Sequence, residues 1–335
     1  MAFSGLAQKY RGALVQSRMS PISRSACILT FGLMAVGCLS SMATNFTITS
    51  LPNILPLVLY VVVLDVITQV VPQSKIVEAV RTLLYGVLYL VITILCGVLA
   101  AYAMQRFAFP LQDRFLERAD VVLGLDWAAF AHWVDRHATV QGIFHFAYDT
   151  IKLQIALPLV VLAFTNRLSD VRTYLLAFSI AFIATIFVSA LLPAAGPIAF
   201  VDRTAFDVLR FTGATPIDHL MRLREAGPLV LNDPPGGIAT FPSFHATVAV
   251  LTPLALRRYR PILAVLIFLN SAMLAATVTE GAHYFVDVLA GSCMAIFAYC
   301  LASYIIGIED RSFQRTVPSH QPANSVVAGC EGRPA

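Results

Sequence analysis

Two short segments of the chain carry side chains that could together transfer a phosphoryl group. The first reads FPSFH at residues 241–245, the second reads HYFVD at residues 283–287, and each places a histidine at the start of a long apolar run. Asp287 follows His283 by four residues, so the two side chains share one face of a helix, one turn apart. The segments predict a catalytic site that contains His283, Asp287 and His245.

Phosphoryl transfer requires a nucleophile, a proton donor for the leaving oxygen and groups that hold the phosphate. A neutral imidazole can attack phosphorus near pH 7, and a carboxylate bound to its other nitrogen fixes the tautomer and stabilises the cation that forms. We expect His283 to be the nucleophile, Asp287 to orient it and His245 to be the general acid. A lone histidine at a helix end is usually structural and His-x-x-x-Asp can also bind a metal, so the prediction depends on the combination.

Four residues are candidates for binding the phosphate. The Ser243 hydroxyl and the free N–H groups of a helix start can hold phosphate oxygens, and Gly237 would let the backbone approach closely. Lys152, near the outer end of an apolar run, and Arg203, in a polar loop, are the candidate cations. Lys152 could instead pair with Asp149, and Arg203 could be a solvated loop charge. The same loop also carries Arg222 and Arg224.

The composition indicates a membrane protein. Of 335 residues 58% are hydrophobic and only 13% are charged, and the mean hydropathy is +0.76. Soluble proteins carry about 25% charged residues, so this chain has too few to cover a soluble surface. The net charge of +4 comes from basic residues in short loops, which favours membrane topology over nucleic-acid binding. The six cysteines show no spacing typical of a metal site or a disulfide framework, and we expect no metal and no cofactor.

The apolar runs predict an all-α polytopic membrane helix bundle of about eight spans. They cover approximately residues 26–42, 51–71, 83–104, 143–164, 174–192, 245–256, 262–279 and 283–306. Residues 127–134 indicate a short amphipathic helix at the membrane surface. The predicted organisation is a cytoplasmic N-terminal segment at 1–25, two additional spans within 26–82, a six-helix catalytic core at 83–307 and a disordered cytoplasmic tail at 308–335.

The distribution of basic residues predicts the orientation of the bundle. Each short loop on the N-terminal side is net basic or carries paired cations, whereas the two short loops on the other side carry no cation other than a histidine. By the positive-inside rule both termini are cytoplasmic, and both histidine segments open to the periplasm or lumen. A transporter that uses the histidines as a proton relay is a less favoured alternative. Asp65 is its only plausible membrane-embedded charge, and helix packing explains that residue better.

The two histidine segments resemble the second and third signatures of the type 2 phosphatidic acid phosphatase superfamily. They are more similar to its inositol phosphotransferase branch, which includes the fungal inositol phosphorylceramide synthases. The phosphatase branch has Pro-Ser-Gly-His where this chain has Phe244, and Ser-Arg where it has Ala276 and Thr277. The Lys…Arg-Pro first signature has no convincing match, although PAAGP at 193–197 is similar to a proline-rich stretch of the synthase branch. The resemblance covers approximately residues 110–305.

The resemblance implies that His283 is the nucleophile, Asp287 its partner and His245 the acid, with no metal required. It predicts an enzyme that transfers an inositol phosphate-like headgroup from a phosphatidylinositol-like donor to a ceramide- or diacylglycerol-like acceptor. Hydrolysis of a lipid phosphate or a prenyl diphosphate is the alternative, because the same phosphohistidine intermediate serves both reactions. Phe244 and the missing arginines favour transfer. The expected partners are lipids and the membrane, without nucleic acid, and the oligomeric state stays open.

Overall fold

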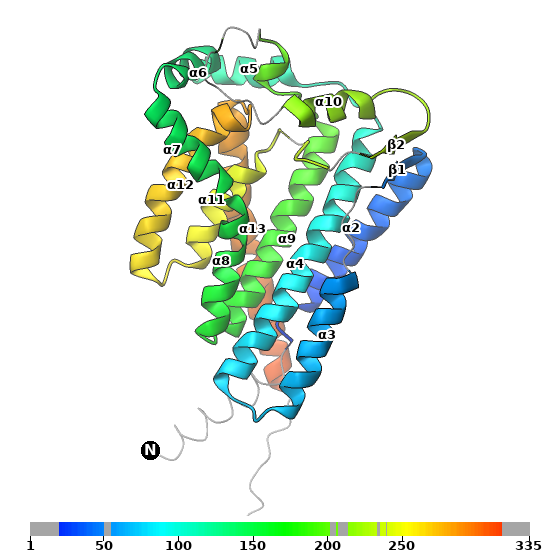
Figure 1. Cartoon of the computed structure of the whole chain (residues 1–335), viewed down its shortest axis with the longest axis vertical. Helices are drawn as coiled ribbons and strands as arrows, with labels where there is room; N and C mark the ends of the chain where they lie inside the picture. Colours follow the sequence, from blue (N-terminus) through cyan, green and yellow to red (C-terminus); the bar gives the residue numbers. More distant parts are fainter. Residues whose placement is uncertain are drawn as a thin grey trace, which may run out of the picture.

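The computed structural model describes residues 20–49, 55–201, 206, 214–232, 235–238 and 240–316. Within these residues, five helices are long and apolar enough to cross a membrane. They are α2 (Arg24–Ala43), α4 (Lys75–Gln105), α9 (Leu168–Leu191), α12 (Arg260–Glu280) and α13 (Phe285–Thr316) (Figure 1). The prediction of an all-α polytopic membrane bundle is confirmed.

The predicted fourth span is two helices rather than one. α7 (Ala138–Asp149) and α8 (Ile151–Phe164) meet at a bend of 48°, and together they form a sixth crossing if counted as one span. The Thr150 N–H and hydroxyl both donate to the Ala147 carbonyl, at 3.3 and 2.6 Å, which tightens the last turn of α7. The predicted span over 143–164 corresponds to this bent pair, and the bend was not predicted, because an apolar run does not reveal how a hydroxyl competes for backbone carbonyls.

The second and sixth predicted spans are shorter than a full crossing. α3 (Leu55–Val70) has 16 residues and α11 (Phe244–Ala255) has 12. At about 1.5 Å per residue α11 is about 18 Å long, whereas the hydrocarbon core of a bilayer is about 30 Å thick. α11 begins where the Ser243 hydroxyl accepts a hydrogen bond from the Ala246 N–H at 3.3 Å, which is an N-cap. α11 by itself therefore does not span a bilayer.

Short elements lie across the end of the bundle where α13 begins (Figure 1). They are α5 (Asp113–Val122), α6 (Trp127–Asp135), α10 (Ala214–Leu223) and the strands β1 (Phe46–Ile48) and β2 (Leu229–Leu231). The helix α6 agrees with the amphipathic helix predicted over 127–134. β1 and β2 pair in parallel with Phe46 opposite Leu229, which ties the segment after α2 to the long polar loop. This pairing was not predicted from the sequence.

At the opposite end of the bundle, the start of α2 lies beside the end of α13. The Ser25 N–H donates to Glu309 at 3.1 Å, and Arg172 of α9 pairs with Glu309 at 2.7 Å and also with Asp310. α13 continues to Thr316, so the expectation that a disordered tail begins at residue 308 was wrong. Residues 317–335 lie outside the described part of the chain.

Two further predicted boundaries differ from the helices. α2 begins at Arg24, inside the predicted N-terminal segment 1–25, of which residues 1–19 are outside the described part. α4 begins at Lys75, so the division between 26–82 and 83–307 falls within one helix. α2 packs on α4 and α9, and the additional helices therefore belong to the same bundle as the rest. The assignment of catalysis to residues 83–307 stays a prediction.

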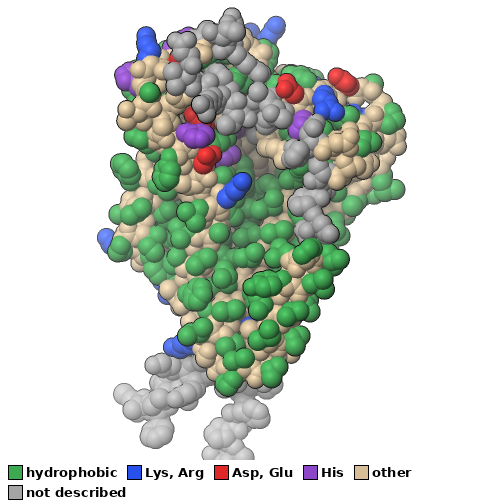
Figure 2. Space-filling view, viewed as in Figure 1, with side chains coloured by type: hydrophobic (Ala, Val, Ile, Leu, Met, Phe, Trp, Pro, Cys, Tyr) green, Lys and Arg blue, Asp and Glu red, His purple; other side chains and the backbone are tan. Residues whose placement is uncertain are grey.

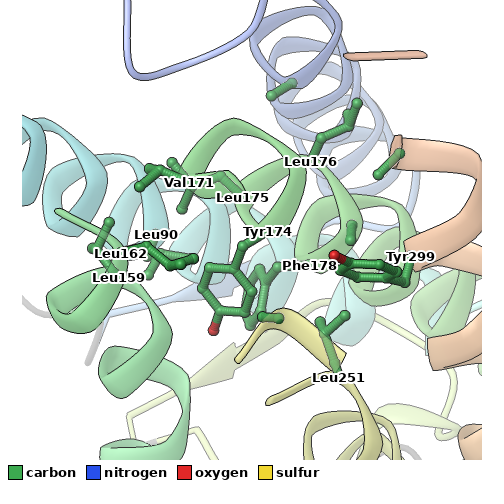
Figure 3. Close-up of a cluster of buried hydrophobic side chains, with 14 of the residues drawn as sticks. Leu90, Leu159, Leu162, Val171, Tyr174, Leu175, Leu176, Phe178, Leu251 and Tyr299 are labelled. Atoms are coloured by element: carbon green, nitrogen blue, oxygen red, sulfur yellow. The ribbon is translucent and has the colours of Figure 1, made fainter. Parts of the chain in front are cut away.

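α9 lies at the centre of the largest core cluster. Its Tyr174, Leu175 and Phe178 side chains are fully buried, and they pack together with Leu251 of α11 and Tyr299 of α13 (Figure 3). Close packing, rather than burial from water, holds helices together inside a membrane. The cluster therefore fixes how α11 and α13, the two helices that begin at the histidine segments, lie relative to one another.

The outer surface of the bundle is apolar, as a lipid-facing surface requires. Figure 2 shows hydrophobic side chains over the lower part of the molecule, while the histidine and acidic side chains visible in this view lie in the upper part. On α3, Asp65 pairs with Arg81 of α4, at 3.2 Å between Oδ1 and Nε. This contact supports the helix-packing interpretation of Asp65.

Candidate active site

The starts of α11 and α13 are joined through their backbones. The Ser243 N–H donates to the Asp287 carbonyl at 3.0 Å, and the Thr247 hydroxyl lies 3.0 Å from both the Ser243 and the Gly291 carbonyl oxygens. A Cβ atom at Gly291 would lie 2.1 Å from the Ser243 carbonyl oxygen, so this approach requires glycine. These contacts bring the two histidine segments to one place.

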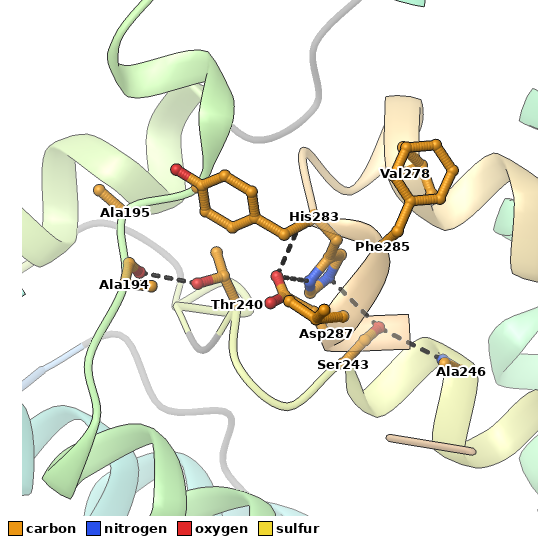
Figure 4. A network of polar contacts seen from close by, with 12 residues as sticks. Ala194, Ala195, Thr240, Ser243, Ala246, Val278, His283, Phe285 and Asp287 are labelled. Carbon is orange, nitrogen blue, oxygen red and sulfur yellow. Dashed lines mark hydrogen bonds and ion pairs between the residues drawn. The ribbon is translucent and has the colours of Figure 1, made fainter. Parts of the chain in front are cut away.

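His283 and Asp287 lie in direct contact, as their spacing predicts. Nδ1 of His283 is 3.2 Å from Oδ2 of Asp287, and the same oxygen accepts the Tyr284 N–H at 3.0 Å (Figure 4). Both side chains are buried, with 4% of His283 and none of Asp287 exposed. A proton on Nδ1, directed at the carboxylate, leaves the lone pair of Nε2 free on the other side of the ring. This is the tautomer that a nucleophilic imidazole needs.

Ser243 faces the free nitrogen of His283. Its Oγ lies 3.4 Å from Nε2, while the same oxygen caps α11 by accepting the Ala246 N–H (Figure 4). The start of α11 carries unpaired N–H groups and the positive end of the helix dipole, both of which attract a phosphate. A phosphate attacked by Nε2 would therefore lie against the Ser243 hydroxyl and the start of α11.

His245 reaches the same place from the first turn of α11. Its imidazole is half-buried, and burial together with the nearby His283 lowers the pKa of His245 to about 3, a shift that the negative charge of a bound phosphate would oppose. The ring also stacks on Tyr148 of α7, with a centroid distance of 4.0 Å and an interplanar angle of 11°. The structure thus brings together all three residues predicted to catalyse the reaction.

Gly237 lies beside the segment that leads to His283. Together with Gly281 and Ala282 it lines a cavity of about 20 Å³. The neighbouring Gly236 donates its N–H to the Tyr102 hydroxyl at 2.8 Å, and that hydroxyl lies 3.1 Å from Nδ1 of His219. The two buried side chains therefore hold the glycine segment in place, a role that the sequence analysis missed.

A family model described as the PAP2 superfamily matches residues 114–301, more than half of the chain and both histidine segments. The chain belongs to the PAP2 superfamily. Membership suggests a phosphatase or phosphotransferase that acts on lipid phosphates. No curated protein and no solved structure gave a significant match.

The PAP2 match begins in α5, which supplies two aspartates that sequence reasoning also missed. Asp120 accepts the N–H groups of Phe285 and Val286, at 2.8 and 2.9 Å, and so caps the start of α13. Asp113 accepts the N–H groups of Ala195 and Gly196, at 3.0 and 2.8 Å. Burial raises the pKa of both carboxyls above the usual range, although the backbone N–H groups oppose the shift. The spacing of Asp113, Leu116 and Asp120 on one helix face was the available signal.

The structure places the candidate cations in different surroundings. Lys152 is exposed in the first turn of α8, and Asp149 lies 3.4 Å from Nε2 of His145, so the alternative in which Lys152 pairs with Asp149 is not observed. Arg203 lies outside the described residues. Arg224 donates to the carbonyls of Ala108 and Phe109, so it braces the end loops instead of facing the histidines. Lys152 is therefore a candidate cation whose side chain is exposed and that no ion pair within the described residues uses.

Packing residues stand at the two positions where the phosphatase branch of the superfamily carries Ser-Arg. Ala276 is buried in an apolar cluster, and the buried Thr277 hydroxyl donates to the Met273 carbonyl at 2.7 Å. Phe244, which replaces a glycine, packs on Phe178 and Phe182 of α9 at centroid distances of 5.6 and 4.9 Å. The Phe244 side chain is therefore part of the core, and its presence is no longer an argument for transfer over hydrolysis.

The described part of the chain holds no cluster of side chains that could bind a metal ion. No three His, Cys, Asp or Glu side chains there are grouped so that they could hold a metal ion. The His283–Asp287 spacing, which could also suit a metal, is used for a hydrogen bond between the two side chains.

Proposed function

We propose that the protein transfers a phospho-headgroup between lipids through a phosphohistidine intermediate on His283. The observation that carries the proposal is the orientation of this imidazole. Its Nδ1 is bound to Asp287, and its Nε2 faces Ser243 at the start of α11. Membership of the PAP2 superfamily supports the coarser statement that the substrate is a lipid phosphate.

The reaction proceeds in two balanced steps. In the first, Nε2 of His283 attacks phosphorus, the bond from phosphorus to the lipid oxygen breaks, and His245 gives its proton to that leaving oxygen. Asp287 stabilises the positive charge that develops on His283. In the second step the hydroxyl of an acceptor lipid attacks phosphorus, the phosphorus–nitrogen bond breaks, and the now neutral His245 takes the hydroxyl proton. Water in place of the acceptor gives hydrolysis.

The phosphate is held by Ser243, by N–H groups at the start of α11 and by the backbone near Gly237. Lys152 supplies positive charge, and Arg203 is assigned the same role. This set carries fewer cations than the phosphatase pattern, because Ala276 and Thr277 replace the Ser-Arg pair. A phosphodiester carries one negative charge and a phosphomonoester close to two, so a small set of cations favours a diester donor. A phosphatidylinositol-like donor and a ceramide- or diacylglycerol-like acceptor fit this preference.

Hydrolysis of a lipid phosphate or prenyl diphosphate is the second candidate, since both reactions share the first step. The proposed membrane orientation is the same for both reactions. Basic residues such as Arg257, Arg258 and Arg260 lie in the short connection between α11 and α12 or at its end, away from the histidines. By the positive-inside rule this side is cytoplasmic and the active site faces the periplasm or lumen.

The experiment uses purified protein in detergent micelles with phosphatidylinositol labelled in its phosphate. In the presence of ceramide, or of a diacylglycerol whose acyl chains differ from those of the donor, transfer yields a new labelled lipid, whereas hydrolysis releases labelled inositol phosphate into water. A His283→Ala variant is the control for contaminating activity. If neither product forms above that control with a diester or a monoester lipid, the proposed function is wrong.

A further inference from the structure

The face of α7 that turns toward the site carries a tyrosine with no part in the mechanism so far. Tyr148 lies flat against His245, with ring centroids 4.0 Å apart and planes only 11° from parallel. Such a contact restricts rotation of the imidazole about its side-chain bonds. It also places the π face of the tyrosine against the ring that must carry a positive charge before the first step.

The same face of α7 is fixed to the end of α12, directly before the second histidine segment. Nδ1 of His145 lies 3.1 Å from Oε2 of Glu280, the buried last residue of α12, three positions before His283. His145 and Tyr148 are three residues apart, so they project from one side of the helix. α7 therefore contacts the first histidine segment and the residue that precedes the second one by three positions, through side chains one turn apart.

Gly281 shows how closely these parts approach one another. A Cβ atom at this position would lie 2.6 Å from Cδ2 of His283 and 3.0 Å from the Tyr148 hydroxyl oxygen. The backbone of Gly281 thus fits between the nucleophile and the tyrosine, and a larger residue would displace one of them. Tyr148 is consequently held at a fixed distance from both histidines.

We infer that Tyr148 is a positioning residue for His245: it orients the ring for proton transfer, and its π face offsets part of the penalty that burial imposes on the protonated imidazole. The inference rests on the proposed function, because it assumes that His245 protonates the leaving oxygen. The charged groups around this pair are known. His283 interacts with His245, while Glu280 and Asp149 interact with Tyr148. Neither carboxylate is altered by a substitution of Tyr148.

The test compares two donors that differ in their need for a proton. Phosphatidylinositol releases an alkoxide, which needs general acid assistance worth about 10²–10⁴-fold, whereas a nitrophenyl ester of inositol phosphate releases a stable phenolate. For Tyr148→Leu we expect kcat/KM on the lipid to fall by about 10–100-fold and kcat/KM on the aryl ester, which reports the first step alone, to fall by less than about threefold. The fall of kcat/KM at high pH should begin at a lower pH, because the protonated imidazole has lost its aromatic partner. Tyr148→Phe, which keeps the ring, should restore both donors and the pH profile.

Tyr304→Leu, a substitution of an exposed tyrosine on α13, is the matched control. If Tyr148→Leu does not fold, Tyr148→Met keeps a large apolar side chain and is measured in its place. Equal losses on both donors with an unshifted pH profile, or no loss at all, would overturn the inference and leave the proposed function standing. Failure of the proposed function appears separately, as a wild-type protein that forms no phosphoenzyme from either donor.

Discussion

The backbone N–H of Ser243 donates to the backbone carbonyl of Asp287 over 3.0 Å, and this bond sets the register between α11 and α13. Because the bond uses backbone atoms, side-chain substitutions at either residue leave it available. It places the Ser243 hydroxyl opposite Nε2 of His283 and holds His245, two residues later, on the same side. The geometry of the candidate site therefore depends on how closely the two helix starts approach.

A substitution at Gly291 tests this dependence. A Cβ there would lie 2.1 Å from the Ser243 carbonyl oxygen, so Gly291→Ala must push the start of α11 away from α13. We expect a loss of about 1–3 kcal/mol in the free energy of unfolding, and a fall in kcat of about 10²-fold because the histidines shift by about 1 Å. Gly32→Ala in α2, where no atom lies within 4 Å, is the control and should be neutral or stabilising. Thermal unfolding in detergent and turnover measure the two effects, and equal behaviour of the two variants would contradict the prediction.

Asp287→Asn tests the role of the carboxylate. An amide N–H facing Nδ1 of His283 would force the ring proton onto Nε2 and remove the lone pair that attacks phosphorus. We expect kcat to fall on the order of 10²–10⁴-fold with little change in KM, as for other histidines that lose the right tautomer. Asp126→Asn is a suitable control, because Asn caps the start of α6 as well as Asp does. A variant of Asp287 that kept more than half of the wild-type rate would rule out this role.

Phe244→Ala separates packing from reaction specificity. The ring packs on Phe178 and Phe182, so its loss should lower the free energy of unfolding by about 3 kcal/mol. The ratio of transfer to hydrolysis should stay unchanged, because the side chain belongs to the core of the bundle. Phe268→Ala, which removes an exposed ring from α12, should leave both quantities unchanged. A shift toward hydrolysis in Phe244→Ala would restore this residue as a determinant of transfer.

Lys152→Met tests the proposed phosphate contact. Lys152 is exposed and lies one turn beyond Tyr148, and no ion pair within the described residues uses it. We expect KM for a lipid phosphate to rise about tenfold while kcat changes less, since one cation contributes to binding on the order of 1.4 kcal/mol. Lys75→Met, at the other end of the bundle, should not alter either constant. An unchanged KM in Lys152→Met would assign the phosphate charge to other residues.

The sequence was sufficient to predict contacts that are local along the chain. The contact of His283 with Asp287 was predicted from their spacing, although His283 lies just before α13 begins at Phe285, so the contact crosses the helix start instead of running along one helix face. The helix at 127–134 and the membrane bundle were also predictable, because both depend on how apolar residues are distributed along the chain. The bend at Thr150 did not, because a hydropathy pattern carries no information about side-chain hydrogen bonds to the backbone.

Contacts between distant segments were beyond the sequence analysis. Asp113 and Asp120 of α5 bind backbone groups of two other segments. Tyr102 and His219 meet only when the end loops fold over the bundle. Tyr148 stood among several polar residues at the start of an apolar run, with no sequence feature that singled it out. Predicting any of these contacts requires knowing which helices are neighbours in the fold.

The central claim is most directly tested by trapping the intermediate. In His245→Ala, a nitrophenyl ester of inositol phosphate can load His283 without a proton donor, but the second step lacks its general base. Phosphoryl-enzyme should therefore accumulate, stable to alkali and labile to acid. Mass spectrometry of alkaline digests should then find the modification on the peptide that contains His283. The absence of a modified peptide in His245→Ala, or a modification that persists when His283 is also replaced by alanine, would contradict the phosphohistidine mechanism.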